Sequence, residues 1–126
     1  MTVLDASAVL ALVQDEAGAG LVERELRGSL LCTVNLAEVT GKLVDADLDP
    51  RRLVPRLRAA GVIVEPLTQH DAELAGALRG LVGGRALSLG DRCCLSLALR
   101  DPSGAVLTAD RAWAALDLPL TVRLIR

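Results

Sequence analysis

The chain has 126 residues, of which 52% are hydrophobic and 24% are charged, so it can bury a core, is not disordered, and is expected to form one domain, residues 1–126. Tyrosine and phenylalanine are absent and Trp113 is the only aromatic residue, which excludes the stacked rings on which many single-strand binders hold their bases. The net charge of −2, taken by itself, argues against a polyanionic partner.

Strands and helices alternate along the predicted chain, with limits set by glycines, prolines and the helical spacing of apolar residues. In chain order the predicted elements are a strand at 2–4, helices at 6–13 and 19–26, a strand at 29–33, helices at 36–47 and 51–60, a strand at 62–64, a helix at 68–79, a loop at 80–87, a helix at 89–99, a strand at 105–107, a short helix at 111–116 and a strand at 121–124. Pro55 is expected to kink the helix that Pro50 begins. Short apolar strands separated by helices indicate a parallel α/β sheet with both faces covered.

The helix at 89–99 constrains the topology, because only residues 100–104 connect it to the strand at 105–107. If that strand is parallel to the others, the helix must begin at the carboxyl edge of the sheet. The loop at 80–87 must then climb back to that edge. Residues 88 and 91 would lie where open α/β sheets build their sites.

Four carboxylates are predicted at the carboxyl edge of the sheet. Asp5 ends the first strand, and Glu38 lies in the first turn of the helix after the second strand. Asp91 lies in the first turn of the helix before the fourth strand, and Asp110 follows that strand. Hard divalent cations such as Mg²⁺ prefer oxygen ligands, and carboxylates around such an ion can activate water and clamp a phosphodiester.

The same carboxylates also fit a purely structural role. The segments 35–38 and 88–91 both have the pattern of a capping box, and Asp5 and Asp110 stand where helix N-caps are expected. Parallel topology brings every such cap to one edge, so position alone does not distinguish the two roles. Four clustered acids would repel one another unless a cation joined them, which favours the metal site. The similar segment 68–71 is interpreted as a cap only.

Four segments resemble the motifs of the PIN-domain family, and most of all those of its VapC-type toxin branch. They are Val3-Leu-Asp-Ala-Ser-Ala8, Val34-Asn-Leu-Ala-Glu-Val39, Leu87-Ser-Leu-Gly-Asp-Arg92 and Leu107-Thr-Ala-Asp-Arg-Ala-Trp113. They occur in the family's order over nearly the whole chain. The resemblance implies a three-layer α/β/α fold whose five parallel strands have the order 3-2-1-4-5, with a crevice between the first and fourth strands.

The resemblance also implies roles for individual residues. Asp5, Glu38 and Asp91 match the three core acids of a metal centre, and Asp110 matches the fourth. The residues implied around them are Ser7, Asn35 and Thr108 as supports, Arg111 as a phosphate contact and Trp113 as a packing residue. The pair Cys93-Cys94 departs from the small residues usual in the family, and is interpreted as packing because reduced cysteine behaves as a small hydrophobe.

The function that the resemblance implies is a Mg²⁺- or Mn²⁺-dependent endoribonuclease that cleaves RNA by metal-activated water and leaves a 3′-hydroxyl and a 5′-phosphate. It further implies a toxin that forms a homodimer and is held inactive by a cognate antitoxin, for which the apolar helices near 8–26 and 36–57 could supply a groove. Two alternatives remain. One is a non-catalytic PIN-like protein-binding module, and the other is a phosphoryl-transfer enzyme or receiver domain, for which Lys42 is poorly placed.

The charge balance changes once the four site acids are set aside, because 14 basic residues then face 12 acidic ones. A cleft that held a divalent ion would no longer repel RNA. Arginine makes up 13 of the basic residues and suits phosphate, and Arg85 in the glycine-rich loop is a candidate RNA contact. Arg51, Arg52 and Arg56 are interpreted as a solvated helix face.

The remaining reactive residues do not indicate another chemistry. His70, the only histidine, is interpreted as an exposed residue at a helix start, and the three cysteines lack the spacing of a disulfide framework or a zinc site. The sequence contains no signal-peptide pattern and no membrane-spanning apolar stretch. A cytoplasmic protein with reduced thiols is therefore expected.

Overall fold

The sheet has five parallel strands in the order β3-β2-β1-β4-β5, as the resemblance implied. The computed structural model describes residues 1–126, and its strands are β1 (Thr2–Leu4), β2 (Leu30–Cys32), β3 (Ile63–Glu65), β4 (Ala105–Thr108) and β5 (Thr121–Leu124). The central strands β1 and β4 pair from Thr2 opposite Ala105 to Leu4 opposite Leu107. The residue after β1 therefore stands beside the end of β4.

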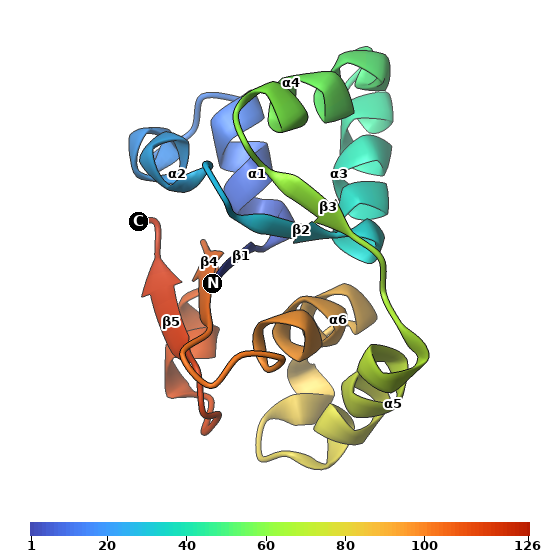
Figure 1. The fold of residues 1–126 in the computed structure, drawn as a ribbon, viewed down its shortest axis with the longest axis vertical. Coiled ribbons are helices and arrows are strands. Elements are labelled where there is room, and N and C mark those ends of the chain that lie inside the picture. Colours follow the sequence, from blue (N-terminus) through green and yellow to red (C-terminus); the bar gives the residue numbers. More distant parts are fainter.

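Helices cover both faces of this sheet and complete a three-layer α/β/α fold (Figure 1). The α-helices are α1 (Ala6–Val13), α2 (Ala19–Glu25), α3 (Thr33–Asp45), α4 (Leu53–Ala59), α5 (Gln69–Ala77) and α6 (Leu89–Ala98). Short 3₁₀ helices are η1 (Pro50–Arg52), η2 (Leu78–Gly80), η3 (Gly84–Ala86) and η4 (Arg111–Ala115). Helices α1 to α4 lie on one side of the sheet, and α5 and α6 lie on the other.

The sheet separates two hydrophobic cores, because successive residues of a strand point to opposite faces. The strand residues of the first core, under α1 to α4, are Leu4, Leu31 and Leu107, and those of the second core, under α5 and α6, are Val3, Cys32 and Val106. Trp113 is fully buried in the second core, which confirms its predicted packing role. Cys93 and Cys94 are buried there as free thiols, so they also pack.

Helix α3 begins earlier than predicted. It starts at Thr33, directly after β2, with Cys32 at the N-cap position. The prediction placed its start at 36, because Asn35 has the side chain of a common cap. Asn35 is instead the third helical residue and fully buried, and Glu38 lies in the second turn rather than the first. The capping box predicted at 35–38 is therefore wrong.

The helix predicted at 51–60 forms in two consecutive parts, the 3₁₀ turn η1 and then α4, and the helix type changes before Pro55. Turn η1 comes first, where the Asp49 side chain accepts a hydrogen bond from the backbone N–H of Arg51, and α4 then starts at Leu53. Pro55 is the third residue of α4, where a missing N–H costs no intrahelical hydrogen bond. The backbone stays helical through the junction of η1 and α4, where Arg52 and Leu53 both have right-handed helical angles.

Helix α6 begins at the carboxyl edge of the sheet, as the predicted topology requires. The Nδ2 atom of Asn35, in the first turn of α3, donates to the carbonyl oxygen of Gly90 in the first turn of α6 at 3.0 Å. The segment between α5 and α6 contains only the turns η2 and η3, and it returns the chain to this edge. None of the helices has both the length and the apolar character needed to cross a bilayer.

The buried carboxylate of Asp71 fixes α5 against the end of α6. Its Oδ2 atom accepts from the backbone N–H of Thr68 at 2.9 Å, which confirms the cap predicted at 68–71. Arg100, just after α6, binds both carboxylate oxygens and also donates to the carbonyl oxygen of Pro66. The Arg100 guanidinium lowers the pKa of Asp71 from 3.8 to about 2.

Replacing Arg100 with alanine should lower the free energy of unfolding by roughly 1.5–3 kcal/mol at neutral pH, because a buried carboxylate loses its charged hydrogen bonds. The pKa of Asp71 is depressed on folding, so the pair stabilises fully above the unfolded value of 3.8 and loses this effect as the pH falls toward 2. Urea unfolding over this pH range measures both effects. The control is Arg58→Ala, because Arg58 is exposed and makes no ion pair. An equal loss in both variants would contradict the assignment.

Candidate active site

The predicted site residues gather where the central strands β1 and β4 end. Asp5 and Ser7 follow β1, and Thr108 is the last residue of β4. Asn35 and Glu38 come from α3, which starts directly after β2. The start of α6 joins them through the contact between Asn35 and Gly90. The carboxyl edge of the sheet therefore brings together chain segments that are far apart in the sequence.

Asp5 is held by two hydroxyl groups. Its residue is only 5% exposed, and its Oδ2 atom accepts hydrogen bonds from Ser7 Oγ at 2.6 Å and from Thr108 Oγ1 at 2.9 Å. Asp5 occupies the N-cap position of α1, yet its side chain makes no capping hydrogen bond. The structural alternative for this residue, a plain helix cap, is wrong because the carboxylate is directed to the two hydroxyls instead.

Backbone N–H groups fix the direction of these hydroxyl hydrogen bonds. Ser7 Oγ accepts from the N–H of Ala109 at 2.9 Å, and Thr108 Oγ1 accepts from the N–H of Asp110 at 3.0 Å. Each hydroxyl therefore keeps its single proton for Asp5. Ser7 and Thr108 lie where the sequence placed them, in direct contact with an acid.

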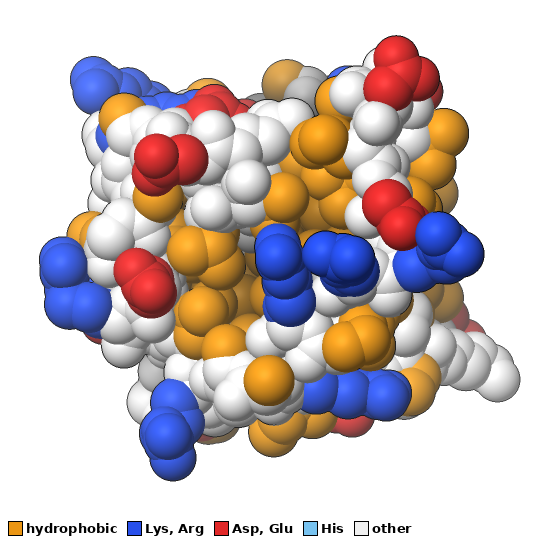
Figure 2. Space-filling view, turned by 90° about the horizontal axis from the view of Figure 1, so that it is seen from above, with side chains coloured by type: hydrophobic (Ala, Val, Ile, Leu, Met, Phe, Trp, Pro, Cys, Tyr) orange, Lys and Arg blue, Asp and Glu red, His pale blue; other side chains and the backbone are white.

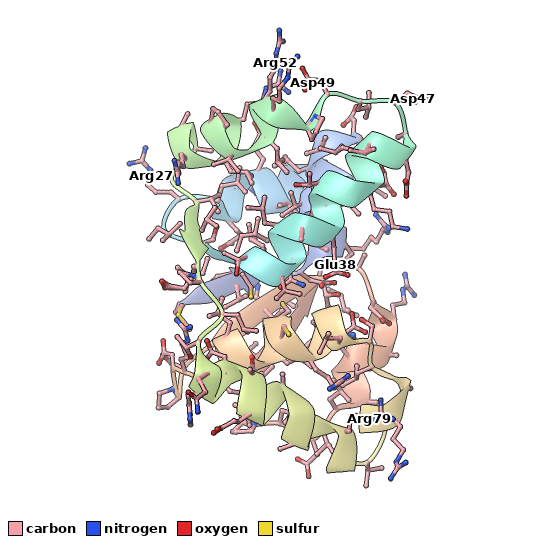
Figure 3. All side chains as sticks on the ribbon, turned by 90° about the vertical axis from the view of Figure 1, so that its right-hand side faces the viewer. Arg27, Glu38, Asp47, Asp49, Arg52 and Arg79 are labelled. Atoms are coloured by element: carbon pink, nitrogen blue, oxygen red, sulfur yellow. The ribbon has the colours of Figure 1, made fainter.

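Glu38 lies between α3 and the start of α6 (Figure 3). Its Oε1 atom accepts a hydrogen bond from Nδ2 of the buried Asn35 at 2.7 Å. The same Nδ2 atom donates to the carbonyl oxygen of Gly90, so Asn35 contacts both the acid and α6. Asn35 thus supports Glu38 as the resemblance implied, although it does so from inside the helix and not as its cap.

Asp91 forms a capping box with Ser88 at the start of α6, as the capping alternative predicted. Its Oδ2 atom accepts from the N–H of Ser88 at 2.9 Å, and Ser88 Oγ accepts from the N–H of Asp91 at 3.1 Å. This capping box starts α6 and leaves the Oδ1 atom of Asp91 without a hydrogen bond. The cap therefore occupies one oxygen of the half-buried carboxylate and leaves the other free for a ligand.

Asp110 is the fourth acid at this edge, and its backbone N–H donates to Thr108 Oγ1, one of the two hydroxyls that hold Asp5. Asp110 is exposed, and its Oδ1 atom caps η4 by accepting from the N–H of Ala112 at 3.0 Å. No hydrogen bond connects its side chain to Asp5, Glu38 or Asp91. The two predicted RNA contacts, Arg85 in η3 and Arg111 in η4, are also exposed, and neither takes part in an ion pair.

The electrostatics of the edge are dominated by unpaired negative charge. None of the six ion pairs involves Asp5, Glu38, Asp91 or Asp110. Burial raises the pKa of Asp5 above 3.8, hydrogen bonds from Ser7 and Thr108 oppose this rise, and the charge of Asp91 adds to it. Helices α1, α3 and α6 all begin here, and their partial positive charges favour nearby carboxylates without neutralising them.

These residues fit a hard divalent cation. The donors are carboxylate oxygens, which Mg²⁺ and Mn²⁺ prefer, and the buried Asp5 lacks a cationic side chain to balance its charge. No three acidic, histidine or cysteine side chains already converge as a complete ligand set. Asp91 and Asp110 direct one oxygen each to their own helices, so a shared ion requires these side chains to present their remaining oxygens.

Gly90 is the residue of this site that the sequence prediction missed. A Cβ atom at this position would lie 2.2 Å from Oε1 of Glu38, so the absence of a side chain gives the carboxylate its place. The available signal was a glycine inside the first turn of an otherwise strong helix, where glycine is unfavourable unless packing or function requires it. His70 is exposed at the start of α5, as predicted.

Comparisons with known proteins agree with this architecture. The sequence model of the PIN domain matches residues 2–118, whereas no curated protein matches the chain. A toxin–antitoxin complex from Klebsiella pneumoniae is similar with a TM-score of 0.72 and 15% identity over 96% of both chains. DNA-bound VapBC from Salmonella typhimurium has a TM-score of 0.70 and 13% identity over 99% of this chain and 98% of that one. VapC20 from Mycobacterium tuberculosis, described as a sarcin–ricin loop cleaving toxin, has a TM-score of 0.69 and 16% identity over 92% of this chain and 96% of that one.

Replacing Asp5 with asparagine should stabilise the metal-free protein at neutral pH. The raised pKa of Asp5 means that the folded state binds the proton more tightly than the unfolded state, so the ionised carboxylate destabilises the fold above that pKa. Asparagine removes the charge and keeps an oxygen that can accept from Ser7 and Thr108. Thermal unfolding in chelator measures the effect, and it should vanish in acid, where Asp5 is protonated. The exposed Asp45→Asn change is the matched control, and an unchanged midpoint in Asp5→Asn would contradict the prediction.

Proposed function

The chain belongs to the PIN-domain family, and from that premise we propose that it is a divalent-metal-dependent endoribonuclease that acts as the toxin of a toxin–antitoxin pair. The observation that supports this most directly is the buried, unpaired carboxylate of Asp5, whose pKa is raised by burial and by the charge of Asp91. A protein that only needed a helix cap would not place these charges together without a cation. The structural neighbours described as toxin–antitoxin complexes support the same biological setting.

Asp5, Glu38 and Asp91 would hold the Mg²⁺ or Mn²⁺ ion, with Asp110 as a fourth acid on the exposed side. The bound ion would lower the pKa of water and stabilise the negative charge that develops on the phosphate group during hydrolysis. Ser7 and Thr108 keep Asp5 in place, and Asn35 does the same for Glu38. None of these site residues is a histidine that could act as a general base. The role of the protein's own residues is therefore to position the carboxylates and the phosphodiester.

Arg85 and Arg111 are the proposed contacts for RNA phosphates. Both are exposed and neither is engaged by an acid, so both remain available to a polyanion. Arg111 follows Asp110 directly at the start of η4, which places it beside the acids at the edge. Arginine suits this contact because its planar fork can bind two phosphate oxygens.

A groove on the α1 to α4 side is the proposed docking site for the antitoxin. It has a volume of about 490 Å³, and residues from three helices and the loop after α3 line it, among them Leu12, Val13, Leu43, Leu48, Leu53 and Leu57. Figure 2 shows this hollow of apolar side chains with basic side chains across its edge. Arg52 and Arg56 line the groove without an ion-pair partner, so it suits an apolar segment that carries acidic residues. The homodimer expected from the resemblance remains part of this proposal.

Replacing Asp5 with asparagine should abolish RNA cleavage by the purified protein, because one of the proposed metal ligands loses its charge. Cleavage of total RNA in Mg²⁺ or Mn²⁺, with a chelator control, is the measurement. Asp45→Asn, which changes an exposed acid at the end of α3, should cleave like the wild type. Retained cleavage in Asp5→Asn, or cleavage that survives the chelator, would refute the role given to the acids.

The non-catalytic alternative makes a different prediction for the same protein. A module that only binds a partner would show no heat of Mn²⁺ binding in calorimetry and no cleavage under any condition. The intact set of acids argues against that alternative, as does the unpaired charge at the edge.

Replacing Leu48 with glutamate should release the toxin from its antitoxin, because a charge would enter the apolar groove. Expression of either the wild type or Leu48→Glu should arrest growth, and co-expression of the small gene that neighbours this one should rescue only the wild type. Ile63→Glu is the matched control, because Ile63 on β3 is 52% exposed and Leu48 is 46% exposed. Rescue of Leu48→Glu would show that the antitoxin docks elsewhere.

A further inference from the structure

The first turn of α6 leaves a space that a side chain would fill, and the Glu38 carboxylate occupies it. A Cβ atom built on Gly90 would lie 2.2 Å from Oε1, 2.6 Å from Oε2 and 2.5 Å from Cδ of Glu38. These are its three nearest neighbours, and all belong to one flexible side chain. Gly90 lies inside α6, and it is not one of the glycines with a positive φ. The backbone conformation therefore does not require glycine here, whereas the position of the Glu38 carboxylate does.

Asn35 closes the other side of this space. Its Nδ2 atom donates to Oε1 of Glu38 at 2.7 Å and to the carbonyl oxygen of Gly90 at 3.0 Å. The amide is fully buried and bridges α3 and α6, so both helices share one donor group. The carboxylate of Glu38 is thus placed against the backbone of the residue that precedes Asp91. Glu38 as a residue is exposed, and its carboxylate accepts no other hydrogen bond.

We propose that Gly90 is a positioning residue of the metal centre, which seats the Glu38 carboxylate beside Asp91 because it has no side chain. This inference rests on the proposed function, since it assigns Gly90 a role toward the ion that these acids would hold. If a side chain at position 90 displaced the carboxylate, Glu38 would have to lose the freedom of several rotamers each time an ion bound. With glycine at position 90, the Glu38 carboxylate is already beside Asp91, so less side-chain conformational entropy is lost when the ion binds.

Gly90→Ala separates the two possible roles of this glycine, because replacing glycine with alanine ordinarily stabilises a helix. Alanine is a better helix former than glycine, so Gly90→Ala should leave α6 intact. The new methyl group should displace only the Glu38 carboxylate, whose far end can rotate away. Loss of metal binding without loss of the fold is therefore the expected combination, and a merely structural glycine would not give it.

The test is Mn²⁺ titration calorimetry on the full-length chain, with thermal unfolding of each metal-free variant. Gly90→Ala should bind Mn²⁺ about 10- to 100-fold more weakly than the wild type, as is typical when a residue that orients a ligand is changed. Gly76→Ala is the matched control, because Gly76 also lies in a helix and a Cβ there would meet nothing within 4 Å. It should bind Mn²⁺ like the wild type.

A double-mutant cycle shows whether Gly90 acts through Glu38. In a Glu38→Ala background, adding Gly90→Ala should cause no further loss of Mn²⁺ affinity, because the carboxylate that the methyl group displaces is absent. Additive losses would overturn the proposal, as would unchanged binding in Gly90→Ala alone. A Gly90→Ala protein that fails to fold would overturn it too, since glycine would then serve the fold. Absence of Mn²⁺ binding in the wild type would instead refute the proposed function itself.

Discussion

Two hydroxyl groups that donate to one oxygen of Asp5 are the interaction on which the site depends. A carboxylate that is 5% exposed, has no cationic partner and lies near Asp91 would move toward water if nothing restrained it. Ser7 and Thr108 restrain it, and their own orientation is fixed by the N–H groups of residues 109 and 110. Because Ser7 follows β1 and Thr108 ends β4, this small network also joins the two central strands where they end.

The parallel order of the strands explains why so much charge can gather at one edge. Strands β1, β2 and β3 are each followed by an α-helix and β4 by the 3₁₀ helix η4, all of which begin at the carboxyl edge, and α6 reaches the same edge through the turns η2 and η3. Helix starts supply free N–H groups and partial positive charge, which suit carboxylates. The same feature makes caps and metal ligands look alike in a sequence. The cap at Asp91 uses a single carboxylate oxygen, so it does not exclude a second role for the other oxygen.

Most of the fold was predictable from the sequence because short apolar strands and amphipathic helices leave a clear pattern, and the strand order came from the family resemblance. The errors arose where a side chain bonds to a distant segment. Asn35 looked like a cap because its local pattern fits one, and only the approach of α6 shows that its amide bonds there. Gly90 was missed for the same reason, since the carboxylate that needs its space lies 52 positions earlier in the chain. The four acids were placed at the correct edge, but the exposed position of Asp110 depends on η4, which a sequence pattern does not orient.

Helix α6 leaves little room for evolutionary change. Eight of its ten residues are buried, so almost every position packs against residues of the second core or of the site. Substitutions should be tolerated better outside α6, and the turns at 78–86 that precede it are exposed over much of their length. These turns are therefore the part of the chain beside α6 in which substitutions should cost the fold least.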